Sequence, residues 1–172
     1  MLTTSFLVAA LAATGLAQVV APAGYRTVYI TSAVNAKFVV VPKTPVKSGT
    51  TIVVQTLTSK PDQQWYITAG KTKVQLAGTT LCLDAGVKSG WKDMGTIWLK
   101  DCSATEDGQK WNALTDGRIA LDLSSPQQCI DLQYMRATAN NPVGLYQCAG
   151  LGNTGAADKG INWPLTNATT AP

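Results

Sequence analysis

The chain has 172 residues, 45% of them hydrophobic, which is the size and composition of one domain with a substantial core. Its 14 basic and 10 acidic residues give a net charge of +4, and the lysines are scattered, so the charge favours solubility and does not indicate a nucleic-acid partner. The sequence has no histidine, which removes the commonest general base and metal ligand.

The first seventeen residues predict an export signal. Residues 4–13 form an apolar run, and the small residues Gly15 and Ala17 occupy the −3 and −1 positions of a cleavage site before Gln18. The run is shorter than the roughly 18 apolar residues of a membrane span, and no later stretch is longer. We therefore expect a secreted, extracellular protein with no membrane insertion, folded as one domain over residues 18–172.

Short β-strands are predicted along the rest of the chain. Residues 25–30, 52–57 and 97–102 alternate between apolar and polar side chains, and glycines separate such segments at intervals typical of hairpins. Asp116-Gly117 is a strong signal for a two-residue turn. No long segment after the export signal keeps the apolar spacing of a helix, so we expect an all-β fold.

The chain also contains an internal repeat. Trp65, Trp111 and Trp163 each lie near the end of a similar stretch, 46 and 52 residues apart. Units of roughly four strands cannot bury their apolar faces alone, so three of them should pack around a pseudo-threefold axis. The three indole rings are then expected to lie in one shared core.

The four cysteines follow the same repeat. An even number of cysteines in an exported chain indicates two disulfides, and the repeat favours pairing within a unit, Cys82 with Cys102 and Cys129 with Cys148, among three possible connectivities. In the first unit Phe38 and Leu57 have the same spacing. We expect this apolar pair to replace a disulfide.

All three units carry parts of the motifs of a known family, and two of them keep the full Gln-x-Trp signature. The second contains Cys82-Leu83-Asp84 and Gln109-Lys110-Trp111, the third contains Cys129-Ile130-Asp131, and the first contains Gln63-Gln64-Trp65. This pattern resembles the repeat of the ricin B-chain lectins, although the last unit, Ile161-Asn162-Trp163, keeps only the tryptophan. The resemblance implies a β-trefoil of three four-strand repeats with pseudo-threefold symmetry, over about residues 25–70, 71–117 and 118–167.

In that family a sugar site lies within one repeat. An aspartate after the first cysteine accepts hydrogen bonds from two hydroxyls, and an aromatic ring two residues before the second cysteine stacks on the sugar. Asp131 and Tyr146 match this pair in the third repeat, where Gly144 replaces the usual amide. The loop 149–161 either brings Asn153 or Asn162 to the site or covers it.

The other two repeats depart from the pattern. The second keeps Asp84 but has Lys100 at the aromatic position, so Trp98 is a candidate stacking platform; alternatively, Trp98 packs against a neighbouring loop and Asp84 caps a turn. The first repeat has Val40 and Gln55 at the two key positions. We expect no sugar site there.

These features together predict a non-enzymatic, carbohydrate-binding protein whose partners are glycans or glycoconjugates, with no cofactor and no metal. The alternative is a trefoil that has lost its sugar site and serves as a protein-binding scaffold, either a protease inhibitor or an interaction effector. Asn167-Ala168-Thr169 is a sequon, which makes Asn167 a candidate glycosylation site. Residues 166–172 are expected to be a disordered end.

Overall fold

The computed structural model describes residues 21–168, so the predicted export signal lies outside the described residues. The strands are β1 (Arg26–Ile30), β2 (Phe38–Pro42), β3 (Ile52–Thr56), β4 (Trp65–Ile67), β5 (Gly70–Thr72), β6 (Gln75–Leu76), β7 (Leu81–Asp84), β8 (Trp98–Asp101), β9 (Trp111–Ala113), β10 (Ile119–Leu121), β11 (Gln128–Leu132), β12 (Val143–Gln147) and β13 (Leu165–Asn167). Six 3₁₀ turns join them: η1 (Pro61–Gln63), η2 (Lys88–Gly90), η3 (Asp107–Gln109), η4 (Gln133–Met135), η5 (Leu151–Asn153) and η6 (Gly155–Ala157). Over this part of the chain no helix is long and apolar enough to cross a bilayer.

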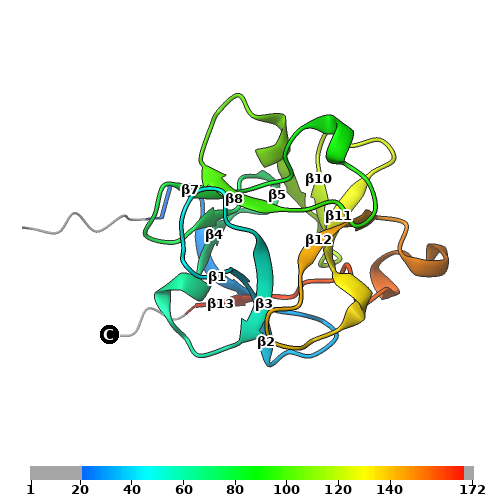
Figure 1. The fold of residues 1–172 in the computed structure, drawn as a ribbon, viewed down its shortest axis with the longest axis horizontal. Helices are drawn as coiled ribbons and strands as arrows, with labels where there is room; N and C mark the ends of the chain where they lie inside the picture. The colour runs from blue at the N-terminus through cyan, green and yellow to red at the C-terminus, as the bar shows by residue number, and fades with distance from the viewer. Residues whose placement is uncertain (1–20, 169–172) are drawn as a thin grey trace, which may run out of the picture.

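The strands form the predicted all-β trefoil (Figure 1). The hairpins β2–β3, β7–β8 and β11–β12 are joined pairwise by isolated β-bridges, Thr51 to Trp98, Val53 to Pro142 and Thr96 to Gly144. Each hairpin therefore contacts the other two, which is the contact pattern of a threefold arrangement. The remaining strands extend β7–β8 into a six-stranded sheet and β11–β12 into a five-stranded sheet, whereas β2–β3 forms a two-stranded sheet of its own.

The second repeat contains five strands instead of four. Its first strand is divided into β5, which pairs with β9, and β6, which pairs with β4 and β7. Val74 lies between the two parts and is fully buried in the core. The chain bends at this point because it passes from one sheet to the other while keeping an apolar side chain inside.

Three tryptophans form the centre of the core, as predicted. All three rings are fully buried in the same hydrophobic cluster. Each indole Nε1 donates to a backbone carbonyl of the first hairpin strand in its own repeat, at 2.9, 3.1 and 2.8 Å: Trp65 to Val40, Trp111 to Leu83 and Trp163 to Ile130. The buried N–H groups are therefore satisfied, and these bonds define which residues are equivalent.

The equivalence corrects the predicted register of the first repeat by one residue. Val40 is the counterpart of the residue that directly follows the cysteine in the other repeats. Val39 therefore stands at the cysteine position, where it packs with Leu57, and Val41 stands at the aspartate position. The prediction of Phe38 and Val40 for these places was wrong because no cysteine marks the register in this repeat.

The two predicted disulfides are present. Cys82 pairs with Cys102 and Cys129 pairs with Cys148, each with a Cα–Cα distance of 5.0 Å. Both close within their own repeat across the strands of one hairpin. Two disulfides indicate folding in an oxidising environment.

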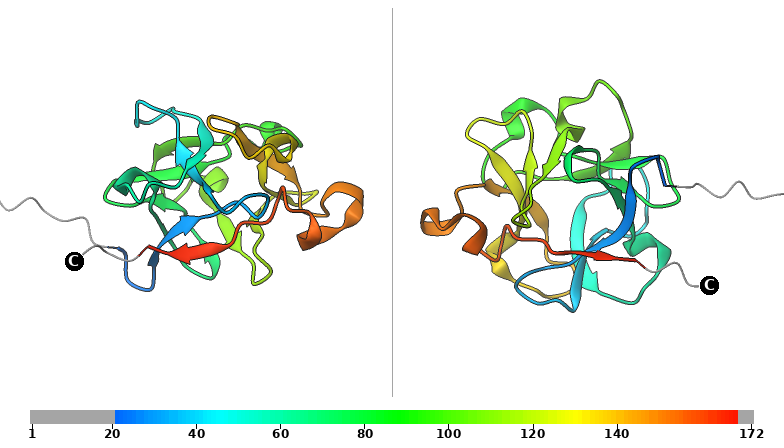
Figure 2. Two further views of the ribbon diagram at one scale, coloured as in Figure 1. Left: turned by 90° about the horizontal axis from the view of Figure 1, so that it is seen from below. Right: turned by 180° about the vertical axis from the view of Figure 1, so that it is seen from behind.

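The C-terminal segment differs from the prediction of a disordered end. Thr166 and Asn167 belong to β13, which lies along β1 at the edge of the six-stranded sheet (Figure 2), and residues 169–172 lie outside the described residues. The side-chain oxygen of Asn167 accepts a hydrogen bond from Arg26 at 3.0 Å. Asn167 is exposed on this edge, and its glycosylation remains a prediction.

Candidate functional site

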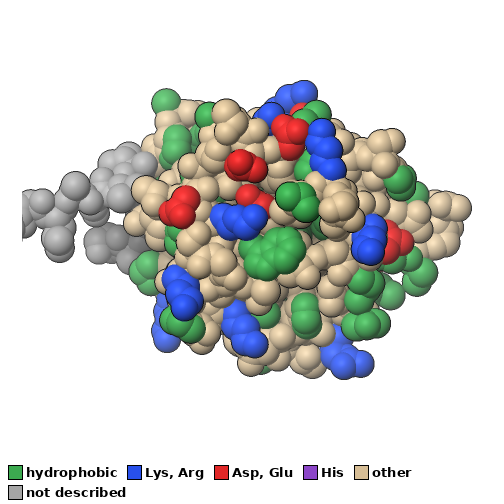
Figure 3. All heavy atoms as spheres, turned by 45° about the horizontal axis from the view of Figure 1, so that its top comes forward, with side chains coloured by type: hydrophobic (Ala, Val, Ile, Leu, Met, Phe, Trp, Pro, Cys, Tyr) green, Lys and Arg blue, Asp and Glu red, His purple; other side chains and the backbone are tan. Residues whose placement is uncertain are grey.

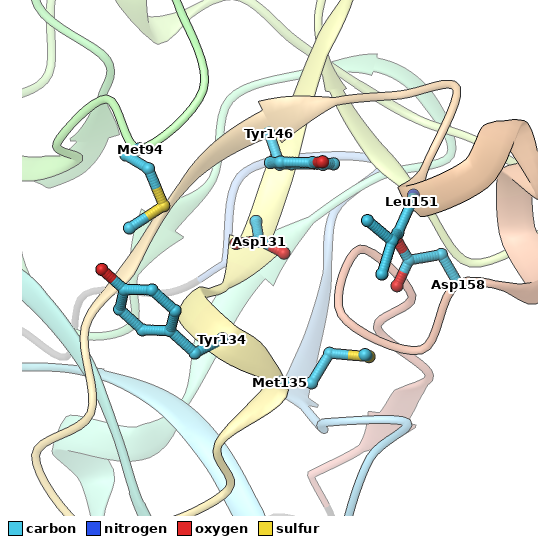
Figure 4. Close-up of a pocket in the computed structure, with 7 residues that line it drawn as sticks. All are labelled: Met94, Asp131, Tyr134, Met135, Tyr146, Leu151 and Asp158. Atoms are coloured by element: carbon cyan, nitrogen blue, oxygen red, sulfur yellow. The ribbon is translucent and has the colours of Figure 1, made fainter.

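A pocket of about 400 Å³ opens on the third repeat. Its walls come from β11, β12, the turn η4, the segment before β8 and the loop 149–161, through Met94, Asp131, Tyr134, Met135, Tyr146, Leu151 and Asp158. Figure 4 shows Asp131 in the middle of the ring that the other six side chains form. The predicted pair, Asp131 and Tyr146, is therefore brought together in one pocket.

Strand pairing positions these two residues. Asp131 on β11 lies opposite Gly144 on β12, and Tyr146 lies opposite Cys129, two residues from Asp131 on the same face of the hairpin. A Cβ atom at Gly144 would lie 2.6 Å from Nε2 of Gln133 and 2.6 Å from the carbonyl of Gly95. The family's amide is missing here because no side chain fits between these groups.

Asp131 is the unusual residue of the pocket. The residue is only 7% exposed, and no described residue donates a hydrogen bond to its carboxylate. Burial raises the pKa of Asp131 to about 7, and repulsion from the carboxylates of Asp158 and Asp93 adds to the effect. A buried carboxylate without a protein partner is costly, which makes it a candidate ligand-binding group.

A second carboxylate lies beside it. Asp158 accepts hydrogen bonds from the backbone N–H groups of Leu151 at 2.7 Å and Gly160 at 2.8 Å, so it holds the loop 149–161 against the pocket. A Cβ atom at Gly160 would lie 2.9 Å from Oδ1 of Asp131 and 3.1 Å from Oδ1 of Asp158. The glycine therefore lets the two carboxylates approach one another.

The rim of the pocket has an unusual backbone. Met94, Tyr134 and Met135 have left-handed φ values of 65°, 59° and 49°. This conformation is costly for residues with a side chain, by about 1–3 kcal/mol, and such strain tends to occur at functional sites. It places the Tyr134 ring, 75% exposed, at the pocket mouth.

Asp84, the corresponding aspartate of the second repeat, is fully engaged. It is 2% exposed and accepts hydrogen bonds from the N–H of Gly86 at 2.6 Å, from Nζ of Lys100 at 3.2 Å and from Nε2 of Gln109 at 3.0 Å. The prediction of a sugar-binding role for Asp84 therefore finds no support. The residue caps a turn, which was the alternative.

Trp98 packs against a neighbouring loop, which was the alternative to a stacking platform. Its ring packs over the turn at Gly86, where a Cβ atom would be 2.9 Å from the ring. Nζ of Lys100 lies 5.6 Å from the ring centroid, so the cation stacks on the indole and also reaches Asp84. The ring therefore packs against a neighbouring turn and against the lysine.

The role of Asp84 can be tested by measuring unfolding. Asp84→Asn is expected to lower the free energy of unfolding by about 1–3 kcal/mol, because an amide cannot accept all three of the buried hydrogen bonds. Denaturant unfolding at pH 7 measures the loss. An unchanged stability would contradict the structural role.

Asn162, the third predicted residue of this site, does not line the Asp131 pocket. Its Nδ2 donates to the backbone carbonyls of Asp116 at 2.8 Å and Ala156 at 3.0 Å. Because its neighbours Ile161 and Trp163 are buried in the core, the Asn162 side chain faces the opposite way and anchors the loop. Asn153 does not line the pocket either.

The sequence prediction missed five residues that line the pocket. Tyr134 and Met135 lie in a turn, Met94 comes from the second repeat, and Leu151 and Asp158 belong to the long loop. None stands at a motif position, and only the exposed aromatic ring gives a signal in the sequence. In the described residues no group of three metal-binding side chains was found.

The comparisons with known proteins bear on this geometry. The model of the ricin-type beta-trefoil lectin domain matches residues 78–168, just over half of the chain. The chain belongs to this family. No curated protein matches the sequence.

Solved structures of a designed protein and of two lectins share the fold at low identity. The designed threefold-symmetric protein ThreeFoil is 16% identical with a TM-score of 0.67, over 82% of this chain and 98% of that one. The C-terminal half of the earthworm R-type lectin, solved with GalNAc, is 15% identical with a TM-score of 0.60, over 83% and 98%. The Polyporus squamosus lectin, solved with a human-type influenza-binding epitope, is 17% identical with a TM-score of 0.63, over 84% and 49%.

One residue of the lectin motif explains why the two aspartates differ. In this ricin-type domain Gln109 of the Gln-x-Trp motif donates to Asp84, and its Oε1 accepts from the N–H of Ser103 at 2.8 Å. In the third repeat the glutamine is replaced by the buried Ile161. Among the described residues no amide donates to Asp131, so its carboxylate lacks the partner that Asp84 has.

Proposed function

We propose that this protein is a secreted lectin that binds glycans or glycoconjugates in the Asp131 pocket of the third repeat. Membership of the lectin family supports carbohydrate binding in general. The apolar run at residues 4–13 and the two disulfides support secretion. No catalytic role is proposed for the domain.

One observation carries the choice of site. Asp84 and Asp131 occupy the same place in successive repeats, but Asp84 accepts three protein hydrogen bonds and Asp131 accepts none from the described residues. A carboxylate can bind two vicinal hydroxyls only if its oxygens are not already engaged. Asp131 meets this condition.

The aromatic residues complete the chemistry of the proposed site. Tyr146 is half-buried beside Asp131 and offers a ring face to the C–H groups of a sugar, and Tyr134 stands across the pocket (Figure 4). The pocket is open, so we expect a dissociation constant of about 1 mM, or about 4 kcal/mol per site. Useful avidity then requires several chains or several sites on the glycan.

A glycan array followed by titration of the best ligand tests the proposal. Asp131→Asn and Tyr146→Ala are each expected to weaken binding by about 1.5–3 kcal/mol, which is roughly 10- to 150-fold. Asp62→Asn, an exposed carboxylate in the first repeat, is the matched control and should bind like the parent protein. Binding that survives both substitutions in the third repeat would place the site elsewhere.

A second function, a protein-binding scaffold, is favoured by the apolar rim of the same pocket. Met94, Tyr134, Met135 and Leu151 are all exposed, and Met-rich surfaces adapt to protein partners. An array on which no glycan binds would favour this function over the lectin.

A further inference from the structure

The pocket combines an apolar rim with an acidic base. Of the seven large hydrophobic residues that are exposed within residues 21–168, four line this pocket: Met94, Tyr134, Met135 and Leu151. At the base lie the carboxylates of Asp131 and Asp158, both at least nine-tenths buried. A typical sugar site offers several polar donors, and this pocket offers few.

No positive charge of the described residues compensates these carboxylates. The ion pairs found in residues 21–168 involve other acidic groups, among them Asp107 and Asp122, and none includes Asp131 or Asp158. In the second repeat the corresponding aspartate has a cation, Lys100, at 3.2 Å. The surface elsewhere mixes both signs of charge, as one face illustrates (Figure 3). The third repeat therefore lacks a cation at the place where the second repeat has one.

We propose that the natural ligand supplies this cation: the pocket selects an amino sugar with a free, protonated amine over neutral and N-acetylated sugars. This inference rests on the proposed lectin function and specifies its ligand class. An ammonium group has three donors and no acceptor, so it matches the carboxylate of Asp131, which has no donor among the described residues, and the neighbouring carboxylate of Asp158, which accepts only from two backbone N–H groups. The face of Tyr134, across the pocket, attracts the same charge (Figure 4).

Apolar parts of the ligand fit the rest of the pocket. Met94, Met135 and Leu151 offer flexible apolar surface for the C–H faces of the ring. An N-acetyl group would remove the positive charge and would leave the repulsion between the two carboxylates in place. A neutral hydroxyl at the same position would also leave this repulsion in place, because it carries no positive charge.

Calorimetric titrations at pH 7 and low salt test the selectivity. The probes are the methyl glycosides of galactosamine, N-acetylgalactosamine and galactose, and the same three in the gluco series. In the series that binds, we expect the free amine to bind at least tenfold more tightly than its N-acetylated and neutral forms. Raising the salt concentration should weaken only the amine, because screening acts on the charge.

Two variants assign the effect to the residues. Asp158→Asn should reduce the preference for the amine and keep the binding of the neutral sugar, whereas Asp131→Asn should weaken both; Asp62→Asn is the control. Should the variant Asp158→Asn disturb the loop that it anchors, the salt dependence of the parent protein still decides the question.

The outcomes separate the two proposals. Equal affinity for amine, N-acetyl and neutral sugars would overturn the amine selectivity and leave the lectin function standing. Methylammonium chloride is titrated as a cation without a sugar ring. Its binding with no binding of any sugar would overturn both the lectin function and the amino-sugar selectivity that rests on it. No binding of any probe would overturn both.

Discussion

Asp131→Asn is expected to stabilise the folded protein at pH 8 and to leave its stability near pH 4 almost unchanged. Burial and the neighbouring carboxylates raise the pKa of Asp131 from 3.8 to about 7 in the folded state. Above pH 7 the folded protein therefore holds a buried charge that asparagine does not carry. At 1.36 kcal/mol for each tenfold change in proton affinity, the gain is limited to about 4 kcal/mol.

The direction of the pH dependence follows from proton binding. Below pH 3.8 Asp131 is protonated in both states, and between about pH 4 and pH 7 the unfolded chain loses this proton while the folded protein keeps it. The parent protein should therefore lose stability as the pH rises through this range and level off above it. The sequence contains no histidine, so no imidazole titrates in the same window.

Chemical denaturation at several pH values between 4 and 8 measures this effect. The parent protein and the control Asp62→Asn should show the same decline, and Asp131→Asn should show a flatter profile. A parent protein whose stability rises between pH 5 and pH 8, or an unchanged slope in Asp131→Asn, would refute it. Asp84→Asn is expected to destabilise the folded protein, whereas Asp131→Asn is expected to stabilise it at pH 8. The same substitution should therefore have opposite effects at the two equivalent positions.

Trp111→Ala is expected to lower the free energy of unfolding by about 3–5 kcal/mol, the range for truncation of a buried aromatic side chain. The ring is fully buried and its Nε1 donates to the carbonyl of Leu83, so the variant loses packing and leaves a buried carbonyl without its donor. Trp65→Ala and Trp163→Ala should have losses of the same size, because their bonds are equivalent.

Trp98→Ala is the matched control, because its ring is only partly buried on the surface of the second repeat. Its loss should be clearly smaller than that of Trp111→Ala in the same denaturant titration. Equal losses would mean that Trp98 also belongs to the core and that the outward face of β8 is assigned wrongly.

Local spacing predicted the fold well. The periodic tryptophans, the cysteine intervals and the turn signals all lie within one repeat, so each could be read without knowing which distant strands pair. The disulfides Cys82–Cys102 and Cys129–Cys148 are confirmed for the same reason. The predicted register of the first repeat was wrong because this repeat has no cysteines to mark it. Val39 and Leu57 occupy their places and only pack together.

The site was predicted only in part. The sequence by itself determined that Asp131 and Tyr146 stand at the two motif positions of one repeat, because the resemblance rests on spacing from the two cysteines; the pairing of β11 with β12 then places both on one hairpin. Only the tertiary structure decided that Asp84 is engaged, that Asn162 faces away, and that Asp158 comes to lie beside Asp131. These outcomes depend on contacts between loops that carry no periodic pattern, and the accessibility of a carboxylate is a property of everything packed around it.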